Sequence, residues 1–357
     1  MAPVILALRA SAKTEAMIVS TGQHRELLPQ ALEEFGLHAD RDLGVMVDGQ
    51  TLPGLTARVL EACTKAFDEL RPDAILVHGD TTTAMAGALA GFYASIPVGH
   101  VEAGLRTGDR YSPFPEEMNR CLVDRLSEMH FAPTTGAETN LLREGISGEG
   151  VFVTGNTGID ALLAVAGPRV AHDKKGQRLI LVEAHRRENL GAPIRQIAAA
   201  VQRLVSLRPD IDVVWSVHPN PEVAGPVREA LGGVARVRLV SPPAYRSWAR
   251  LLAAADVLLV DSGGLQEEAP ALGLPVLILR ESTERPEVVA CGAGALVGTS
   301  AANIVDAVCT LLDTPELYRR MASAGSPFGD GQAARRTLQG LLSHFDLGDR
   351  PDRFGGQ

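Results

Sequence analysis

Short apolar segments recur along the chain, and each is followed by polar or glycine residues and then by a helical pattern. RPDAILVHGD (71–80) is apolar without alternation, TTTAMAGALAGFYAS (81–95) has helical spacing, and IPVGHVEA (96–103) is apolar again. Continuous short apolar runs are typical of strands buried on both faces of a sheet. Such strands separated by helices predict an α/β protein with parallel sheets.

The pattern continues along the rest of the chain, which has 357 residues, a length that favours two domains. A segment that begins glycine-rich and ends polar, 155–178, separates two doubly wound halves. We expect one domain over 1–157, rejoined by a C-terminal helix at 333–347, and a second over 158–332. Further strands are expected at 16–21, 128–133, 150–156, 178–185, 211–219, 237–243, 255–264, 273–280 and 293–298, and further helices at 24–35 and 55–70.

The charge balance limits the partners that this chain can have. The formal net charge is −9, which opposes general binding to nucleic acid or anionic membranes. The first residues lack the basic start of a signal peptide, and no apolar run reaches the ~20 residues of a membrane helix. We therefore expect a cytoplasmic location and neither nucleic acid nor a membrane as partner.

Polar residues gather where the expected strands end. HGDTTT (78–83), HVEAGLR (100–106), EAHRRENLG (183–191), VHPNP (217–221) and DSGG (261–264) each follow a strand. Ligands of open α/β sheets bind at the carboxyl edge of the strands, so two such edges predict a cleft between the domains. The charged stretch 100–120, which proline and glycine interrupt, is then a strand-end loop and a helix start at that cleft.

The first half supplies carboxylates. Asp80, Glu102, Glu116 and Glu117 follow strand ends, and converging carboxylates suit general acid–base work on a sugar. For each of them alone, a surface charge or a helix cap is the alternative. HExxH, spaced Cys/His and GxSxG motifs are absent from the sequence, so a metal or acyl-enzyme mechanism has no support there.

The second half supplies groups that suit a phosphate. DSGGLQEEA (261–269) joins a strand end to a helix through small residues, so that backbone N–H groups can approach an anion. EAHRREN (183–189) adds one histidine and two arginines, whose planar forks match phosphate oxygens. A tight turn and a solvated basic loop are the respective alternatives. The sequence holds no GxxxxGK[ST] loop, which disfavours an ATPase.

At these residues the sequence resembles the non-hydrolysing UDP-N-acetylglucosamine 2-epimerases. The phrase RTGD…SPFPEE within 106–117 resembles the members that act on UDP-GlcNAc itself. The matching segments follow each other in order over nearly the whole chain: TGQHRELL (21–28), VHGDTTTAMAGALAGFY (77–93), IPVGHVEAGLRTGDRYSPFPEEMNR (96–120), VTGNTGIDALL (153–163), HRREN (185–189), HPNP (218–221), DSGGLQEEAPALGLPVLILRESTERPE (261–287) and GDGQA (329–333).

The resemblance implies two Rossmann-like domains that face each other across a cleft, the glycosyltransferase-B type of architecture. It implies an isomerase that interconverts UDP-GlcNAc and UDP-ManNAc for polysaccharide biosynthesis, through anti elimination of UDP to 2-acetamidoglucal and re-addition. It further implies a homodimer that needs no cofactor or metal. Departure of UDP builds oxocarbenium character at C1, which acidifies the C2 proton, so the site needs cations on the diphosphate and carboxylates at the sugar.

The resemblance also implies roles for single residues, carried over by position. The catalytic set is Asp80, Glu102, Glu116 and His185, without an assignment of the carboxylate that removes the C2 proton. The substrate-binding set is Arg120, Tyr245, Ser262, Gly263, Gly264 and Glu268. A second, activating UDP-GlcNAc would bind at Gln23, His24, Gln50, Arg186 and His218.

Two features depart from the family pattern. The family begins with a strand and a GTRPE loop, whereas this sequence starts at MAP, where a helix follows that loop. We expect that the first sheet lacks a central strand, that the natural chain starts further upstream, and that a chain beginning at Met1 has weak or no activity. Glu183 stands where relatives usually carry threonine, and a carboxylate beside a phosphate-facing histidine would favour the imidazolium.

Two other functions remain open from the sequence. A hydrolysing 2-epimerase would release free ManNAc and UDP, and a non-catalytic UDP-sugar sensor would bind UDP-GlcNAc without turnover. HVEAGLR (100–106) with PFPEE (113–117) disfavours hydrolysis, and a pure binder has no need of Asp80, Glu102 and Glu116 together.

Overall fold

A computed structural model describes residues 1–22, 27–47, 49–167 and 176–355. The chain forms two compact units, Met1–Ala161 with Gly329–Gln357, and Leu162–Phe328. Helix α7 (Thr157–Ala166) runs from the first unit into the second. The domain boundaries expected from the sequence, after residues 157 and 332, stay a prediction.

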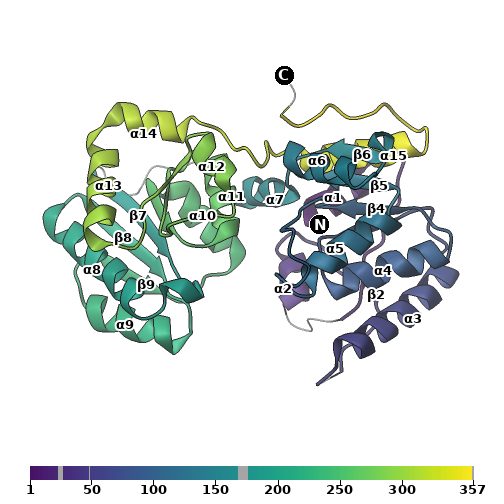
Figure 1. The fold of residues 1–357 in the computed structure, drawn as a ribbon, viewed down its shortest axis with the longest axis horizontal. Helices are drawn as coiled ribbons and strands as arrows, with labels where there is room; N and C mark the ends of the chain where they lie inside the picture. Colours follow the sequence, from purple (N-terminus) through teal and green to yellow (C-terminus); the bar gives the residue numbers. More distant parts are fainter. Residues whose placement is uncertain (23–26, 48, 168–175, 356–357) are drawn as a thin grey trace. The chain divides into compact units, whose positions relative to one another are not determined.

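The first unit holds two separate parallel sheets among the described residues (Figure 1). One sheet has the order β3-β4-β5-β6 and the other pairs β1 with β2. Its strands are β1 (Val19–Ser20), β2 (Arg41–Asp42), β3 (Ile75–His78), β4 (Val98–Val101), β5 (Met129–Ala132) and β6 (Val151–Val153). Its helices are α1 (Ala2–Ala10), α2 (Leu27–Glu33), α3 (Leu52–Leu70), α4 (Thr82–Tyr93), α5 (Glu116–Leu126), α6 (Thr135–Arg143), the short η1 (Gly148–Gly150) and α15 (Ala333–His344).

Among the described residues, β1 and β3 are both edge strands, and they belong to different sheets. Strand β2 was not expected, since two residues carry no periodic signal. That the natural chain starts further upstream stays a prediction.

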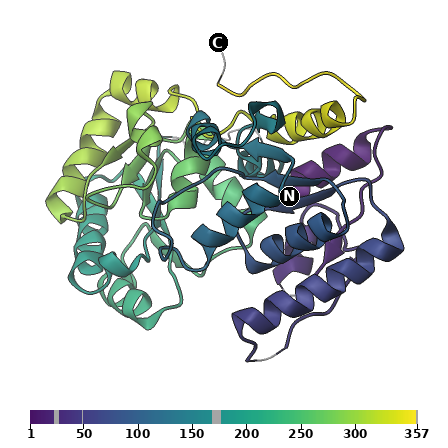
Figure 2. The same ribbon diagram turned by 45° about the vertical axis from the view of Figure 1, so that its right-hand side comes forward.

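Helix α15 packs with α1 onto the first unit, so the two ends of the sequence share one core (Figures 1 and 2). A Cβ on Gly340 would lie 2.8 Å from the ring of Phe131 and 3.1 Å from that of Phe152, so only glycine allows this close approach. The N-terminus of α15 is held by Asp160, which accepts hydrogen bonds from the backbone N–H groups of Ala333 (3.2 Å) and Ala334 (2.8 Å).

The second unit is a parallel sheet of order β12-β11-β10-β7-β8-β9 with helices around it. The chain runs outward from β7 to β9 and then returns to β10, so the strand order reverses between β7 and β10. Its strands are β7 (Arg178–Glu183), β8 (Ile211–Ser216), β9 (Val237–Val240), β10 (Val257–Val260), β11 (Val276–Ile278) and β12 (Gly294–Leu296). Its other elements are η2 (Arg187–Asn189), α8 (Ala192–Leu207), α9 (Pro221–Leu231), α10 (Tyr245–Ala254), α11 (Gly263–Ala271), α12 (Pro286–Ala290), α13 (Ala301–Asp313) and α14 (Pro315–Ala322).

The sequence therefore predicts the α/β class and the positions of the described strands other than β2 correctly. The long apolar stripe of α8 shows why, because Ile194, Ile197, Val201 and Leu204 recur at helical spacing and are all fully buried. Among the described residues, no helix combines the length and the apolar character that crossing a membrane requires.

A buried ionic network joins the loops of the first unit. His100 of β4 donates from Nδ1 to Asp124 (2.6 Å) and from Nε2 to the carbonyl oxygen of Gly79 (2.9 Å). Asp124 of α5 also accepts from the backbone N–H of Gly104 (3.2 Å) and from Arg106 (2.7 Å).

The network closes on helix α6. Arg106 donates to both oxygens of Glu144, at 2.7 and 2.8 Å. Burial would raise the pKa of Asp124, but the hydrogen bond and charge of His100 and the charge of Arg106 lower it. The loops after β3 and β4 are thus tied to α5 by paired charges inside the protein.

We predict that Asp124→Asn destabilises the first unit by about 3–5 kcal/mol, because it leaves His100 and Arg106 without their buried counter-charge. Urea unfolding measures the loss, and hydrogen exchange should show weaker protection of β3 and β4. The exposed Glu61→Gln on α3 is the matched control.

Because the pKa of Asp124 in the folded protein is lowered, its stabilising contribution is present above about pH 4 and is lost as the pH falls through the lowered value. Unchanged stability of the variant at neutral pH would contradict this.

Candidate active site

In the first unit, the polar ends of β3 and β4 lie side by side. The strands are parallel neighbours with His78 in register with Val101, which brings Asp80 and Glu102 to the same edge. Gly79 has a φ of +67°, and a Cβ there would lie 3.0 Å from Oε2 of Glu102. Glycine is therefore required where the carboxylate of Glu102 approaches the turn.

Glu102 itself has a left-handed backbone, with a φ of +71°. A non-glycine residue in this region is uncommon, and such strain is often found at functional sites. Its carboxylate lies 3.5 Å from Nε2 of His78. Desolvation would raise the pKa of Glu102, but the hydrogen bond and charge of His78, and the charges of His100 and Arg120, lower it. Glu102 is thus an ionised carboxylate at neutral pH, able to accept a proton.

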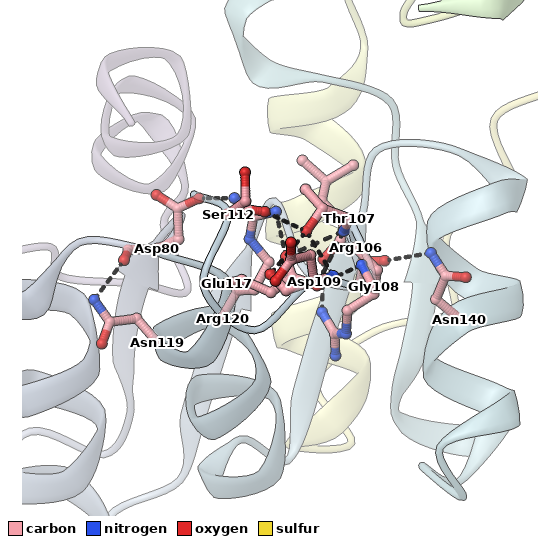
Figure 3. Close-up of polar contacts among 12 residues, drawn as sticks. Asp80, Arg106, Thr107, Gly108, Asp109, Ser112, Glu117, Asn119, Arg120 and Asn140 are labelled. Atoms are coloured by element: carbon pink, nitrogen blue, oxygen red, sulfur yellow. Dashed lines mark hydrogen bonds and ion pairs between the residues drawn. The ribbon is translucent and has the colours of Figure 1, made fainter. Parts of the chain in front are cut away.

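Asp80 is held by helix α5 (Figure 3). Arg120 pairs with its carboxylate, and the amide of Asn119 donates to its backbone carbonyl oxygen at 2.9 Å. Arg120 is expected from the sequence to bind substrate, and the structure shows it as the ionic partner of Asp80 and of Glu117 (3.0 Å). The side chain of Arg120 is only 12% exposed, so it can orient Asp80 while facing little solvent.

The two adjacent glutamates at the start of α5 differ in their surroundings. Glu117 is buried, and it accepts from the backbone N–H groups of Thr107 (3.0 Å) and Gly108 (2.9 Å), which fixes the preceding loop (Figure 3). Glu116 is partly exposed and has no hydrogen bond or ion pair with any described residue. Glu117 is therefore a structural carboxylate, whereas Glu116 is free to meet a ligand.

In the second unit, polar residues meet where the strand order reverses, the position at which open α/β sheets bind ligands. Asp261, directly after β10, is fully buried and organises the loop after β7. It accepts from the backbone N–H groups of His185 and Arg186, both at 2.9 Å, and from the amide of Asn189 at 2.8 Å. A buried carboxylate with this many donors is well satisfied.

An anion cradle follows Asp261 at the N-terminus of α11. Ser262 is the N-cap residue, but its side chain makes no capping hydrogen bond, so the first N–H groups of the helix are not capped by it. Guanidinium atoms of Arg186 and Arg285 lie 3.7 and 3.9 Å from the position of a Cβ on Gly263. The site therefore combines two arginines, a helix N-terminus and a glycine that leaves room for a ligand. This combination suits a phosphate.

His185 and Glu268 complete this edge. His185 contacts Glu183 and stacks on His218, with ring centroids 5.0 Å apart. Burial, with a contribution from Glu267, raises the pKa of Glu268 to about 7. Tyr245 is the first residue of α10 and is partly exposed. Among the described residues, Glu183, His185 and Asp261 are the set whose donor atoms, within 4.8 Å of one another, could hold a metal ion.

The structure places the predicted catalytic and substrate-binding residues in two groups, one in each unit. Asp80, Glu102 and Arg120 meet at the β3–β4 edge, and Glu116 is the first residue of α5 beside them in sequence. In the second unit His185, Ser262, Gly263 and Gly264 follow β7 and β10, Glu268 lies on α11, and Tyr245 begins α10.

The residues expected to bind an activating nucleotide are spread over both units. Gln50 is bound to Arg58 in the first unit, whereas Arg186 and His218 lie beside His185 in the second. Gln23 and His24 lie outside the described residues.

Two further functional candidates, which were not expected from the sequence, become visible in the structure. His78 precedes Asp80 in HGDTTT and faces Glu102, and Arg285 lies within ESTERPE (281–287) and pairs with Glu267. Both are polar residues after a strand end, which is the signal that could have found them.

Comparisons with known proteins agree with this geometry. The family model described as UDP-N-acetylglucosamine 2-epimerase matches residues 6–342. The UDP-N-acetylglucosamine 2-epimerase of Bacillus subtilis is 44% identical over 100% of this chain and 95% of the relative. A solved protein from Listeria monocytogenes matches with a TM-score of 0.93 and 44% identity, over 99% of this chain and 95% of that one. The Neisseria meningitidis UDP-GlcNAc 2-epimerase, solved bound to UDP-GlcNAc, is 42% identical with a TM-score of 0.81, over 96% of each chain. The chain therefore belongs to the UDP-N-acetylglucosamine 2-epimerase family.

Proposed function

We propose that this protein interconverts UDP-GlcNAc and UDP-ManNAc without net hydrolysis, by anti elimination of UDP and its re-addition to 2-acetamidoglucal. The observation that carries the proposal is the division of chemistry between the units. The first unit presents Asp80, Glu102 and Glu116, and the second presents an anion cradle at Ser262 and Gly263. In a sugar nucleotide, the sugar suits the carboxylates and the diphosphate suits the anion cradle.

The cradle accounts for departure of the diphosphate. UDP leaves with developing negative charge, which the N-terminus of α11 and the guanidinium groups of Arg186 and Arg285 can stabilise. Glu268 on the same helix lies one to two turns further on, where its carboxylate can accept ribose hydroxyls. Tyr245 can pack on uracil from the start of α10.

The carboxylates account for proton transfer at C2. Epimerisation removes the C2 proton from one face and returns one to the other, so at least two proton-transferring groups are needed. The ionised Glu102 can take a proton, and Asp80 and Glu116 can supply the opposite face. Exclusion of water from C1 would keep the intermediate from being hydrolysed.

The remaining expectations belong to the same proposal. A homodimer, a cytoplasmic location, turnover without a cofactor or metal, and a second, activating UDP-GlcNAc stay predictions. The stack of His218 on His185 supports coupling between a second nucleotide and the site, because a ligand at His218 would touch the neighbour of a catalytic residue.

We predict that UDP-GlcNAc incubated with the protein in D₂O yields UDP-ManNAc with deuterium at C2, followed by NMR. Asp80→Asn, Glu102→Gln and Glu116→Gln should each slow C2 exchange by at least ~100-fold, because each removes a carboxylate from proton transfer. UDP should still bind these variants, since its cradle is in the other unit.

Exposed Glu61→Gln, in the same unit as these carboxylates, is the control and should retain exchange. Free ManNAc with UDP as the products would instead show a hydrolysing enzyme. Binding of UDP-GlcNAc without any C2 exchange would show a sensor, and either result would overturn the proposal.

Binding should also depend on pH through Glu268. A carboxyl with a pKa of about 7 is largely protonated near pH 6, whereas ribose hydroxyls donate best to the ionised form. We therefore predict that affinity for UDP-GlcNAc rises by up to about tenfold from about pH 6 to about pH 8, with release of a proton. Calorimetry in buffers of different ionisation enthalpy measures both quantities. Glu268→Gln should remove this component, and an unaltered pH dependence in the variant would show that another group is responsible.

A further inference from the structure

Glu183 is a carboxylate for which the reaction described above has no use, and it lies beside His185. It is the last residue of β7 and is paired in register with Val260 of β10. Two residues apart at a strand end, the side chains of Glu183 and His185 can lie on the same face. Oε1 of Glu183 contacts Nδ1 of His185.

The carboxylate of Glu183 has little else to bind. Its side chain is 16% exposed, and its second oxygen, Oε2, is buried without a hydrogen-bond partner among the described residues. Nδ1 of His185 is likewise buried without a well-aligned hydrogen bond there, so its contact with Oε1 of Glu183 is an ion pair. A buried carboxylate oxygen without a donor is costly, so a native structure that keeps one calls for an explanation. The contact with His185 is the interaction that can compensate the charge.

The rest of the environment fixes His185 from other directions. Asp261 accepts the backbone N–H of His185 at 2.9 Å, so it sets the main chain, and its Oδ1 lies 4.0 Å from Nδ1. The ring of His218 stacks on that of His185 with an interplanar angle of 13°. Nδ1 of His218 accepts the N–H of Asn220 at 3.1 Å, so that bond requires Nδ1 without a proton.

We propose that Glu183 is a positioning residue, whose carboxylate pairs with Nδ1 of His185 and thereby keeps Nε2–H available as the donor to the leaving diphosphate. This inference rests on the proposed function, in which His185 acts at the diphosphate. Asp261 holds the main chain of His185, His218 stacks on its ring, and Glu183 pairs with its Nδ1. No hydrogen bond occupies Nε2 within the described part of the chain, so this nitrogen is free to meet a ligand.

The charges around His185 support the imidazolium form. The hydrogen bond to Glu183 raises the pKa of His185, and the charges of Glu183 and Asp261 act in the same direction, against the opposing effects of burial and of Arg186. The stacked ring of His218 is the other titratable group in contact. A proton-loaded Nε2 is the form that can stabilise departing phosphate oxygens.

A metal ion at the same side chains is the competing arrangement. Glu183, His185 and Asp261 have donor atoms within 4.8 Å of one another. Asp261, however, already accepts three N–H groups, so its carboxylate is committed to the loop after β7. The geometry therefore favours an ion pair between Glu183 and His185.

The decisive variant is Glu183→Gln, which keeps the size of the side chain and removes its charge. Glu229→Gln, which is exposed on α9 of the same unit, is the matched control. Nitrogen-15 NMR of histidine-labelled full-length protein follows the ring, and His185→Gln identifies its signals. We expect the pKa of His185 to fall by about one unit in Glu183→Gln and to stay unchanged in the control. In the wild type, the neutral ring should carry its proton on Nδ1.

The second readout is the pH dependence of epimerisation. The alkaline limb of kcat should move to lower pH by about one unit in Glu183→Gln, which is a loss of about tenfold in kcat above both pKa values. At pH below the limb, kcat and KM should stay close to the wild-type values. A purely structural role would instead lower kcat equally at every pH.

The two readouts separate this inference from the proposed function. An unchanged pKa of His185 in Glu183→Gln overturns the role of Glu183, whatever the activity. A lowered pKa in a protein without epimerase activity supports the pairing and contradicts the reaction. Activity that is lost with EDTA and restored by Zn²⁺ or Mn²⁺ in the wild type, but not in Glu183→Gln, would show a metal site and overturn the proposal.

Discussion

A buried aspartate in the first unit is the interaction on which its reactive edge depends. Asp124 is fully buried and holds His100, Arg106 and the N–H of Gly104 at once, which joins the loops after β3 and β4 to helix α5. Asp261 does the same for the loop after β7 in the second unit, and neither carboxylate is exposed to a ligand. Each unit thus contains an internal negative charge that shapes a loop, and the loops carry the residues that can react. Precise placement of such groups is what efficient catalysis requires.

Two chemically identical side chains at the start of α5 have different surroundings. Glu116 and Glu117 are neighbours in the sequence, but Glu117 accepts backbone N–H groups in the interior while Glu116 stays partly exposed. Arg120 connects the interior to the reactive edge, because it pairs with the buried Glu117 and with Asp80. These two ion pairs direct the carboxylate of Asp80 from helix α5. Charge pairing in the first unit therefore prepares the carboxylates before any ligand arrives.

The sequence predicts much of this because the strands are continuously apolar and the polar residues follow them directly. The segment 71–80 shows both signals, and the structure places β3 and Asp80 there. What the sequence could not predict depends on contacts between distant residues. The burial of Glu117, the pairing of Arg120 with Asp80, and the convergence of Arg285 on Gly263 join segments that lie on different elements. The left-handed backbone of Glu102 is equally invisible, since glutamate has no preference for that region.

The placement of α15 affects the order in which the protein can fold during synthesis. The second unit is one continuous segment, Leu162–Phe328, whereas the first needs Gly329–Gln357 in addition to Met1–Ala161. Domains generally fold as units while the ribosome still adds residues. The second unit is therefore fully translated before α15 emerges to cover the core that α1, β5 and β6 share. The first unit is thus translated first but completes its core last. Until α15 emerges, the apolar surface of the first unit stays uncovered and can bind chaperones.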